Sequence, residues 1–544
     1  MLHTVLCCIQ LLAVNSLSIV QFSNRRVVVY GDKSVLCHVE SQGAQHMLML
    51  LEVNVKDLEP SWCRELKMLL LYVSIAVVTF VVVRYVRRNI QYRKLFFQLP
   101  IAAEYRYTTG TLHAYPGRNE EGMATDFIKA QKHCFCHVEW LGPLQPVIVA
   151  YHPDTIRAII KSSAHKPRGS LLSSPYDMGL RWLGEGLLIS NGGKWARSRR
   201  LLTPAFHFDI LKQYVDIYNT CADIMLGKIQ TLSMKKEPFD IYSLINLDAL
   251  DVILRCAFSY LSNCQLDEKP RYHIEFLYSF TEHGRKFYKL CDVAHAVEEE
   301  IIAKRKKELE RSSVPVSNRK VKDFLDTLLT ARDEDGNGMT ALEIRNEVDT
   351  FLFGGHDTTA SGMTWTLYEL AKHPEHQERI YDEVKDVLDG REHLDWNDLP
   401  KLEFTTMCIK EGLRLHSAIP AIERTTVGEC VINGISFPAG NYTTIQLWIL
   451  HHNPHIWEDP HVYNPERFHP DNQANMDPFQ FLPFSAGSRN CIGQNFAMNE
   501  MKTTIARIIR KFRLTVDQKN NVRRLPMVTM KPENKVLLFA SARD

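Results

Sequence analysis

The pattern of hydrophobic and polar positions divides the chain into a short apolar segment near its beginning and a long helical body. The run Met68–Val83 carries no charge. As a helix rising about 1.5 Å per residue it would be about 24 Å long, slightly short of a bilayer core of about 30 Å. After about residue 89 helical periodicity dominates, with strand-like pieces at Gln145–Ala150 and Glu429–Phe437. The pattern predicts a mainly α-helical body with a small β region behind one membrane helix. A buried core helix is the alternative for Met68–Val83.

The charges beside this apolar run favour the membrane interpretation. Acidic residues precede it, and a basic cluster follows it at Arg84, Arg87, Arg88, Arg93 and Lys94. Because basic flanks stay on the cytoplasmic side, everything after Arg84 is expected there. We therefore expect a transmembrane anchor with its basic flank over 61–94 and one folded domain over 95–544. Three interpretations of residues 1–60 stay open. They are a cleaved signal peptide, a second segment in contact with the membrane, and an incorrectly assigned N-terminus.

Composition and charge narrow the class of protein. The 544 residues are 45% hydrophobic and 24% charged, which excludes disordered and fibrous classes. The net charge is only +2, so no general basic field suggests nucleic acid as a partner. The 13 cysteines contain no CxxC pair, a pattern typical of reduced thiols in a domain that faces the cytosol.

One long helix is expected near the middle of the body. Thr340 and Glu343 have the spacing of a capping box, and the helical pattern runs from there to about Lys372, where His373-Pro374 ends it. Two adjacent glycines, Gly354-Gly355, lie in its centre. Because each glycine weakens a helix by about 1 kcal/mol relative to alanine, the pair indicates a place where something approaches the backbone closely.

The segment from Phe484 to Gly493, FSAGSRNCIG, is the most informative one for chemistry. It predicts a loop with one cysteine between glycines, followed by a helix that begins near Gln494. Backbone N–H groups directed at a single sulfur lower the pKa of its thiol and suit a thiolate that binds metal. The alternative is a buried, inert cysteine.

This segment resembles the haem-binding loop of the cytochrome P450 family. The resemblance implies that Cys491 is the axial thiolate ligand of haem iron, that Arg489 pairs with a haem propionate, and that Phe484 packs beneath the ring. Gly487 and Gly493 are the remaining matched positions of the motif. The fold implied is that of a cytochrome P450, mainly α with a small β region, and the cofactor implied is haem b.

Further segments resemble motifs of the same family, in the expected order. Glu411-Gly-Leu-Arg414 is similar to the ExxR motif, and Arg467 in Pro465-Glu-Arg-Phe468 would complete a Glu–Arg–Arg lock with that pair. Trp195 and Arg199 match the WxxxR motif, whose helix reaches the propionates. Arg424 resembles another propionate partner.

The glycine pair belongs to a segment, Gly354–Thr359, that resembles the oxygen-binding signature of the family. By that resemblance the groove beside the glycines admits dioxygen, Thr358 donates a hydrogen bond to it, and Asp357 relays protons. The alternative for Asp357 is an ion pair between helices.

From about His113 onward the chain resembles the fatty-acid omega-hydroxylase branch of the family. The implied reaction is hydroxylation of long-chain fatty acids or eicosanoids at or near the omega end, with O2 and electrons from NADPH. Many members of this branch carry a glutamate, esterified to haem, where this chain has Gly354. We therefore expect non-covalent haem.

No dinucleotide-binding fingerprint is apparent, so the electrons are expected from a partner protein. The resemblance to the family implies that this partner is NADPH–cytochrome P450 reductase, with cytochrome b5 as a second donor. Lys194, Arg197 and Arg200 could form part of a basic docking face, with solvated surface as the alternative. The implied location is the endoplasmic reticulum membrane, with the catalytic domain on the cytosolic side.

Three alternatives stay open. The first is a haem-thiolate isomerase of lipid peroxides, and the second is a hydroxylase of another lipophilic substrate. The third is a membrane-tethered calcium or structural protein without redox chemistry.

Overall fold

The structure is a computed structural model. It describes residues 60–114, 117–162, 165–169, 174–261, 264–265, 282–311 and 323–543. The chain divides into two compact units, Met1–Tyr92 and Arg93–Asp544. Apart from Pro60, the expectations for residues 1–60 lie outside the described residues.

Helix α2 (Pro60–Phe96) contains the apolar run and continues through the basic flank. Within Met68–Val83 most of the described side chains are exposed, among them Leu69 and Phe80. Among the described residues, no helix combines the length and the apolarity needed to cross a membrane.

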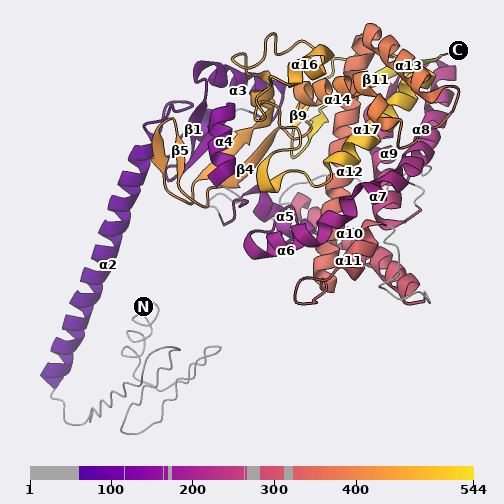
Figure 1. The fold of residues 1–544 in the computed structure, drawn as a ribbon. Helices are drawn as coiled ribbons and strands as arrows, with labels where there is room; N and C mark the ends of the chain where they lie inside the picture. The colour runs from indigo at the N-terminus through magenta and orange to yellow at the C-terminus, as the bar shows by residue number, and fades with distance from the viewer. Residues whose placement is uncertain are drawn as a thin grey trace. The chain divides into compact units, whose positions relative to one another are not determined.

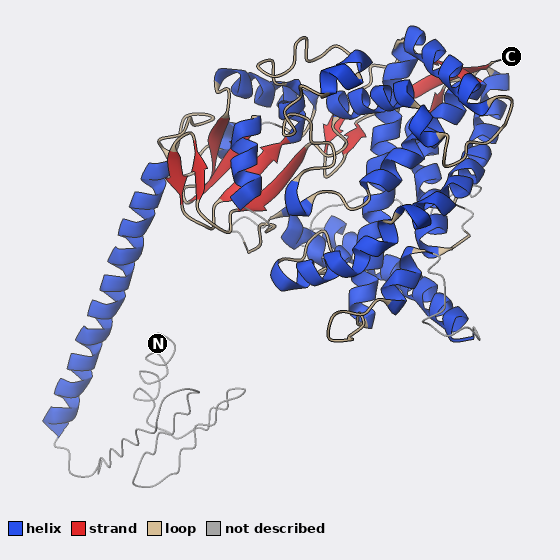
Figure 2. Cartoon of the chain, in the orientation of Figure 1, coloured by secondary structure: helices blue, strands red, loops and turns tan. Residues whose placement is uncertain are grey.

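The second unit is mainly helical, with its largest sheet at one side and a smaller sheet at the opposite side, near the C-terminus (Figures 1 and 2). Its helices along the chain are α3 (Glu120–Lys132), α4 (Pro153–Ser162), α5 (Pro175–Leu183), α6 (Gly192–Leu202), α7 (Phe208–Leu211), α8 (Val215–Lys235), α9 (Ile241–Phe258), α10 (Glu282–Arg311), α11 (Phe324–Thr330), α12 (Ala341–Lys372), α13 (Pro374–Leu388), α14 (Glu403–His416), α15 (Leu447–His452), α16 (Pro470–Gln473) and α17 (Gln494–Lys511).

The long central helix is α12, and it has the predicted bounds. The Thr340 hydroxyl accepts a hydrogen bond from the Glu343 N–H at 3.2 Å, and the Glu343 carboxylate accepts one from the Thr340 N–H at 2.8 Å, so the capping box is confirmed. A Cβ atom at Gly355 would lie 2.6 Å from Ile253 of α9, whereas one at Gly354 would meet nothing within 4 Å. The close approach is thus that of α9, and it requires only the second glycine.

The main sheet has the order β1–β2–β7–β4. Its strands are β1 (Cys136–Leu141), β2 (Gln145–Ala150), β7 (Tyr442–Gln446) and β4 (Ala421–Thr425). β2 pairs with β1 in antiparallel and with β7 in parallel register, and β4 is antiparallel to β7. The predicted strand Gln145–Ala150 is confirmed as β2.

The smaller sheets differ from the sequence prediction at one place. They are formed by β3 (Phe239–Asp240), β11 (Leu537–Ala542) and β8 (Phe512–Val516), by β9 (Arg524–Pro526) and β10 (Met530–Pro532), and by β5 (Cys430–Ile432) and β6 (Ile435–Phe437). The prediction of one strand over Glu429–Phe437 is wrong, because β5 and β6 form a hairpin there. Asn433 and Gly434 turn the chain with φ values of 50° and 76°, a left-handed conformation favoured in two-residue hairpin turns.

Candidate functional site

The predicted cysteine loop has a tightly determined backbone. A 3₁₀ turn covers Gly487–Arg489, and α17 begins at Gln494 as predicted. Gly487 has φ 70°, and a Cβ atom there would lie 2.7 Å from the Ile160 side chain, so only glycine fits without strain. The Cys491 N–H donates to the Phe484 carbonyl at 2.9 Å. The loop therefore closes on itself and presents one sulfur.

Cys491 is a free cysteine and is exposed. Burial raises the pKa of this thiol, whereas the Gly493 N–H and the Arg199 guanidinium act in the opposite direction because both favour the thiolate. A metal cation at the sulfur would complete that change, since a coordinating thiol is deprotonated outright.

Two of the predicted cofactor-binding residues support the loop. Arg199 on α6 donates to the Asn490 carbonyl at 2.9 Å and to its side-chain oxygen at 2.8 Å. The Arg489 guanidinium lies 4.2 Å from the centre of the Trp195 ring. Arg199 and Trp195 thus support the two residues that immediately precede Cys491.

Several buried or partly buried cations gather beside this loop. Arg489 donates to the Ser190 carbonyl at 2.7 Å and to Asn191 at 2.8 Å, and Arg424 on β4 donates to the Ser485 hydroxyl at 3.3 Å. Lys166 is also buried, and its ammonium donates to the Tyr176 hydroxyl at 3.1 Å.

The desolvated positive charges of this cluster favour the binding of an anion. Burial, with Arg424 and Arg199 close by, lowers the pKa of Arg489 to about 9. Burial, together with the nearby Arg424 and Arg489, lowers the pKa of Lys166 well below its usual value. Burial raises the pKa of Glu423, the nearby acid. Carboxylates would relieve this desolvated positive charge. Together with the accessible thiol, this donor set fits haem and its two propionates.

Sequence reasoning missed Lys166, Tyr176 and Asn191. The Asn191 side chain joins Lys166 to Arg489, because its oxygen accepts from the Lys166 N–H at 2.8 Å and from the Arg489 guanidinium. No local pattern marks these residues, since an isolated lysine in a loop is normally a surface residue.

The predicted Glu–Arg–Arg lock is assembled and buried. Arg414 binds Glu411 in a bidentate pair at 2.7 and 2.8 Å, with both side chains fully buried, and Arg467 lies 3.4 Å from the same carboxylate. Arg414 also donates to the carbonyls of His451 and Pro460, both at 2.7 Å. One guanidinium thereby joins α14 to the segment that precedes the cysteine loop.

The two predicted catalytic residues lie in the middle of α12. The Thr358 hydroxyl donates to the Gly354 carbonyl at 2.8 Å. Asp357 is buried, accepts from the Thr529 hydroxyl at 2.6 Å, and lies 3.0 Å from the ammonium of Lys531. The ion pair considered as an alternative for Asp357 therefore exists, but its partner is on strand β10 instead of a helix. Sequence reasoning missed Thr529 and Lys531.

The candidate docking residues are all engaged by acids. Lys194 pairs with Glu185 at 2.9 Å, Arg197 with Asp333 at 2.7 Å, and Arg200 with Glu334 at 2.6 Å. Arg197 also donates to the Gly338 carbonyl. Arg197 and Arg200 thereby hold the loop before α12, whereas Lys194 pairs with an acid that precedes α6. Each of the three basic charges of the expected docking face thus has an acidic partner.

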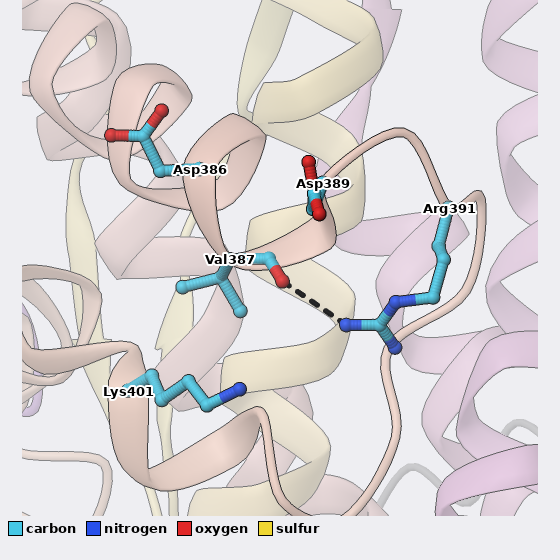
Figure 3. Close-up of a pocket in the computed structure, with 5 residues that line it drawn as sticks. All are labelled: Asp386, Val387, Asp389, Arg391 and Lys401. Atoms are coloured by element: carbon cyan, nitrogen blue, oxygen red, sulfur yellow. Dashed lines mark hydrogen bonds between the residues drawn. The ribbon is translucent and has the colours of Figure 1, made fainter.

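A separate hollow of 560 Å³ lies beside the end of α13 (Figure 3). It is lined by Asp386, Val387, Asp389, Arg391 and Lys401. Arg391 donates to the Val387 carbonyl at 3.1 Å and to Asp398 at 2.8 Å. These lining residues include none of the predicted site residues, so the hollow is not the candidate site.

Comparison with known proteins is consistent with this arrangement. The family model for cytochrome P450 matches residues 109–539. The chain is 42% identical over 449 residues to cytochrome P450 4F6 of Rattus norvegicus, an alignment that covers 77% of this chain and 83% of the relative. It is 42% identical to an ultra-long-chain fatty acid omega-hydroxylase of Homo sapiens, with 73% of this chain and 80% of the relative covered.

A further relative and one solved structure add to these findings. The chain is 42% identical to leukotriene-B4 omega-hydroxylase 3 of Mus musculus, with 73% of this chain and 81% of the relative covered. The crystal structure of the cytochrome P450DA heme domain superimposes with a TM-score of 0.72 and covers 82% of this chain and 98% of that one. At 23% identity this second likeness concerns the fold alone.

Proposed function

Because the chain belongs to the cytochrome P450 family of haem-thiolate monooxygenases, we propose that it hydroxylates long-chain fatty acids or eicosanoids at or near their omega end. The observation that supports this chemistry is the accessible Cys491 thiol beside a cluster of buried and partly buried cations. The substrate class rests on the relatives named for fatty-acid and leukotriene omega-hydroxylation.

The residues that would hold haem b follow from the contacts. Cys491 would ligate the iron, and Arg424, Arg489 and Lys166 would neutralise the propionates. Trp195 and Arg199 would act through the loop that they support. When bound, haem supplies the activation of O2 that inserts one oxygen atom into a C–H bond and reduces the other to water.

The residues on α12 would deliver the protons that this reaction consumes. Thr358 now donates to the Gly354 carbonyl, so its hydroxyl must rotate to donate to a molecule in the groove. Lys531 lies partly exposed beside Asp357 and connects that buried carboxylate to the surface. Burial alone would lower the pKa of Lys531, but the Asp357 carboxylate and Tyr242 outweigh it and raise that pKa. Lys531 therefore stays protonated and holds Asp357 in position.

Replacing Lys531 with glutamine should impair proton delivery without weakening substrate binding. Asp357 would lose its ion pair, and turnover should fall about 10-fold, below the 100-fold or more typical of losing a general acid. We expect less product and more hydrogen peroxide per NADPH, and a larger solvent isotope effect. Lys535→Gln, an exposed lysine four residues further along, is the matched control. An unchanged ratio of product to NADPH in Lys531→Gln would contradict this role.

Gly354 leads to a second prediction, that the haem is held without a covalent bond. Acidified organic solvent should extract it completely. In Gly354→Glu the new side chain starts in open space, so a fraction of the haem should become resistant to extraction. Gly355→Glu cannot serve the same purpose, because its Cβ atom would collide with Ile253. Haem that stays with the unmodified protein would contradict the prediction.

The proposal extends to the electron donor and the membrane. We propose NADPH–cytochrome P450 reductase as the donor, with cytochrome b5 as a second one. The exposed apolar side chains of α2 and the basic residues after them support attachment to a membrane, with endoplasmic reticulum and a cytosolic catalytic domain as the proposed location. Paired acids engage Lys194, Arg197 and Arg200, so the docking face would have to be built from other residues.

The test uses the full chain with haem, reductase and lipid. Labelled long-chain fatty acids should give alcohols at the terminal or neighbouring carbons, and only when NADPH is present. Conversion of lipid hydroperoxides without NADPH, in the absence of hydroxylation, would support the isomerase and overturn the proposal. A purified protein that binds no haem would exclude both.

A further inference from the structure

Two histidines and a glutamate meet where α12 gives way to α13. They are His373, Glu375 and His376, and one ligand atom from each lies within 4.8 Å of the other two. We propose that these three side chains form a site for a divalent transition-metal ion of the zinc class. The site is independent of the haem chemistry described above.

The distances suit a single ion. Glu375 Oε1 lies 3.1 Å from His373 Nδ1 and 4.0 Å from His376 Nε2. In a tetrahedral zinc site with bonds of about 2.0 to 2.1 Å, neighbouring ligand atoms are about 3.3 Å apart. Small rotations of the exposed Glu375 and of His376 would therefore bring all three atoms to bonding distance.

The backbone and a buried tyrosine hold the two imidazoles in place. His373 precedes Pro374 at the start of α13, so His376 follows it within one turn of the helix. Both imidazole rings rest against Tyr463, with ring centres 5.4 and 5.7 Å away. Tyr463 is itself buried, and its hydroxyl donates to the Cys408 carbonyl at 2.9 Å. Such support lowers the entropy lost when a metal binds.

The carboxylate of Glu369 lies near the second ring nitrogen of His373. Glu369 Oε2 lies 3.9 Å from Nε2 of His373, the ring nitrogen that the proposed ion would not use. Glu369 is fixed by His416 and by Lys372, both at 2.9 Å. Metal-binding histidines commonly direct their second nitrogen at a carboxylate, which orients the ring and strengthens it as a ligand.

The ligand set also determines which ions fit. Two imidazoles and one carboxylate favour zinc, nickel or copper over magnesium and calcium, which prefer oxygen ligands alone. A second cluster in the described part of the chain, formed by Asp223, Glu392 and His393, has one imidazole only. Its Asp223 already pairs with Arg507 at 2.5 Å and with His393 at 3.1 Å. That cluster should bind zinc more weakly, and it provides an internal control.

The experiment is calorimetric titration of the full, haem-loaded protein with Zn²⁺ after treatment with a chelator. We expect one tight equivalent, no competition from Mg²⁺ or Ca²⁺, and one zinc per chain retained after gel filtration. His376→Gln and Glu375→Gln should each weaken binding by about 10- to 100-fold. His393→Gln should leave the tight equivalent unchanged.

The variants can be distinguished from misfolded protein. Glu375 is exposed, so Glu375→Gln should fold normally, and the carbon monoxide spectrum of each variant reports an intact haem site. The proposal is overturned if the unmodified protein retains no zinc, or if the tight equivalent survives in both His376→Gln and Glu375→Gln. It is also overturned if His393→Gln removes that equivalent, because the ion would then belong to the second cluster.

Discussion

Cys491→Ser should remove the thiolate signature from the carbon monoxide difference spectrum and reduce hydroxylation by more than about 100-fold. The substitution changes one atom in a loop whose backbone is held by Gly487, by the bond from the Cys491 N–H to Phe484, and by Arg199. The fold should therefore persist. A serine hydroxyl is a far weaker ligand than a thiolate, and it cannot supply the electron density that assists cleavage of the O–O bond.

A matched control separates this effect from general sensitivity to cysteine replacement. Cys134→Ser makes the same change at a partly exposed position on the turn before β1, and its spectrum and activity should match those of the unmodified protein. If Cys491→Ser retained both the thiolate spectrum and hydroxylation, another residue would have to ligate the iron, and the proposed function would lose its basis.

Arg414→Leu should destabilise the domain by about 3 to 5 kcal/mol and sharply lower the yield of haem-loaded protein. Removing this guanidinium leaves the fully buried Glu411 carboxylate with Arg467 as its remaining cation, at 3.4 Å. It also leaves the carbonyls of His451 and Pro460 without their donor. The segment that leads to the cysteine loop would then no longer be held against α14.

The free energy of unfolding is measured by denaturant titration, followed through the absorbance band of haem. Two further variants serve as comparisons. Arg414→Lys keeps the charge but cannot make the bidentate pair, so its loss should be intermediate. Arg181→Gln breaks an exposed pair with Asp292 and should cost less than about 1 kcal/mol. Equal losses in Arg414→Leu and Arg181→Gln would mean that the buried lock adds no more than a surface ion pair.

Local features of the sequence were sufficient for the elements that depend on neighbouring residues. The capping box of Thr340 and Glu343 predicts the start of α12, and the glycines around Cys491 predict its loop, because such turns and caps are completed within a few residues. The spacing of Glu411 and Arg414 likewise predicts a pair on one helix face, and the resemblance to the family supplied its third member, Arg467. The apolar run over Glu429–Phe437 does not itself predict the hairpin of β5 and β6, because the left-handed turn at Asn433-Gly434 reverses the chain within that run.

Tertiary structure alone decided the partners of these residues. Asp357 meets Thr529, which lies 172 positions away, and Arg489 meets Ser190, 299 positions away. Lys166 becomes a buried cation only because α5, β4 and the cysteine loop close around it, and Lys194, Arg197 and Arg200 find acids on segments that fold back onto α6. Hydrophobic periodicity and motif spacing describe neighbours along the chain. The ion pairs and desolvation that set the charge of this site depend on which distant segments pack together, and that is determined only when the whole core forms.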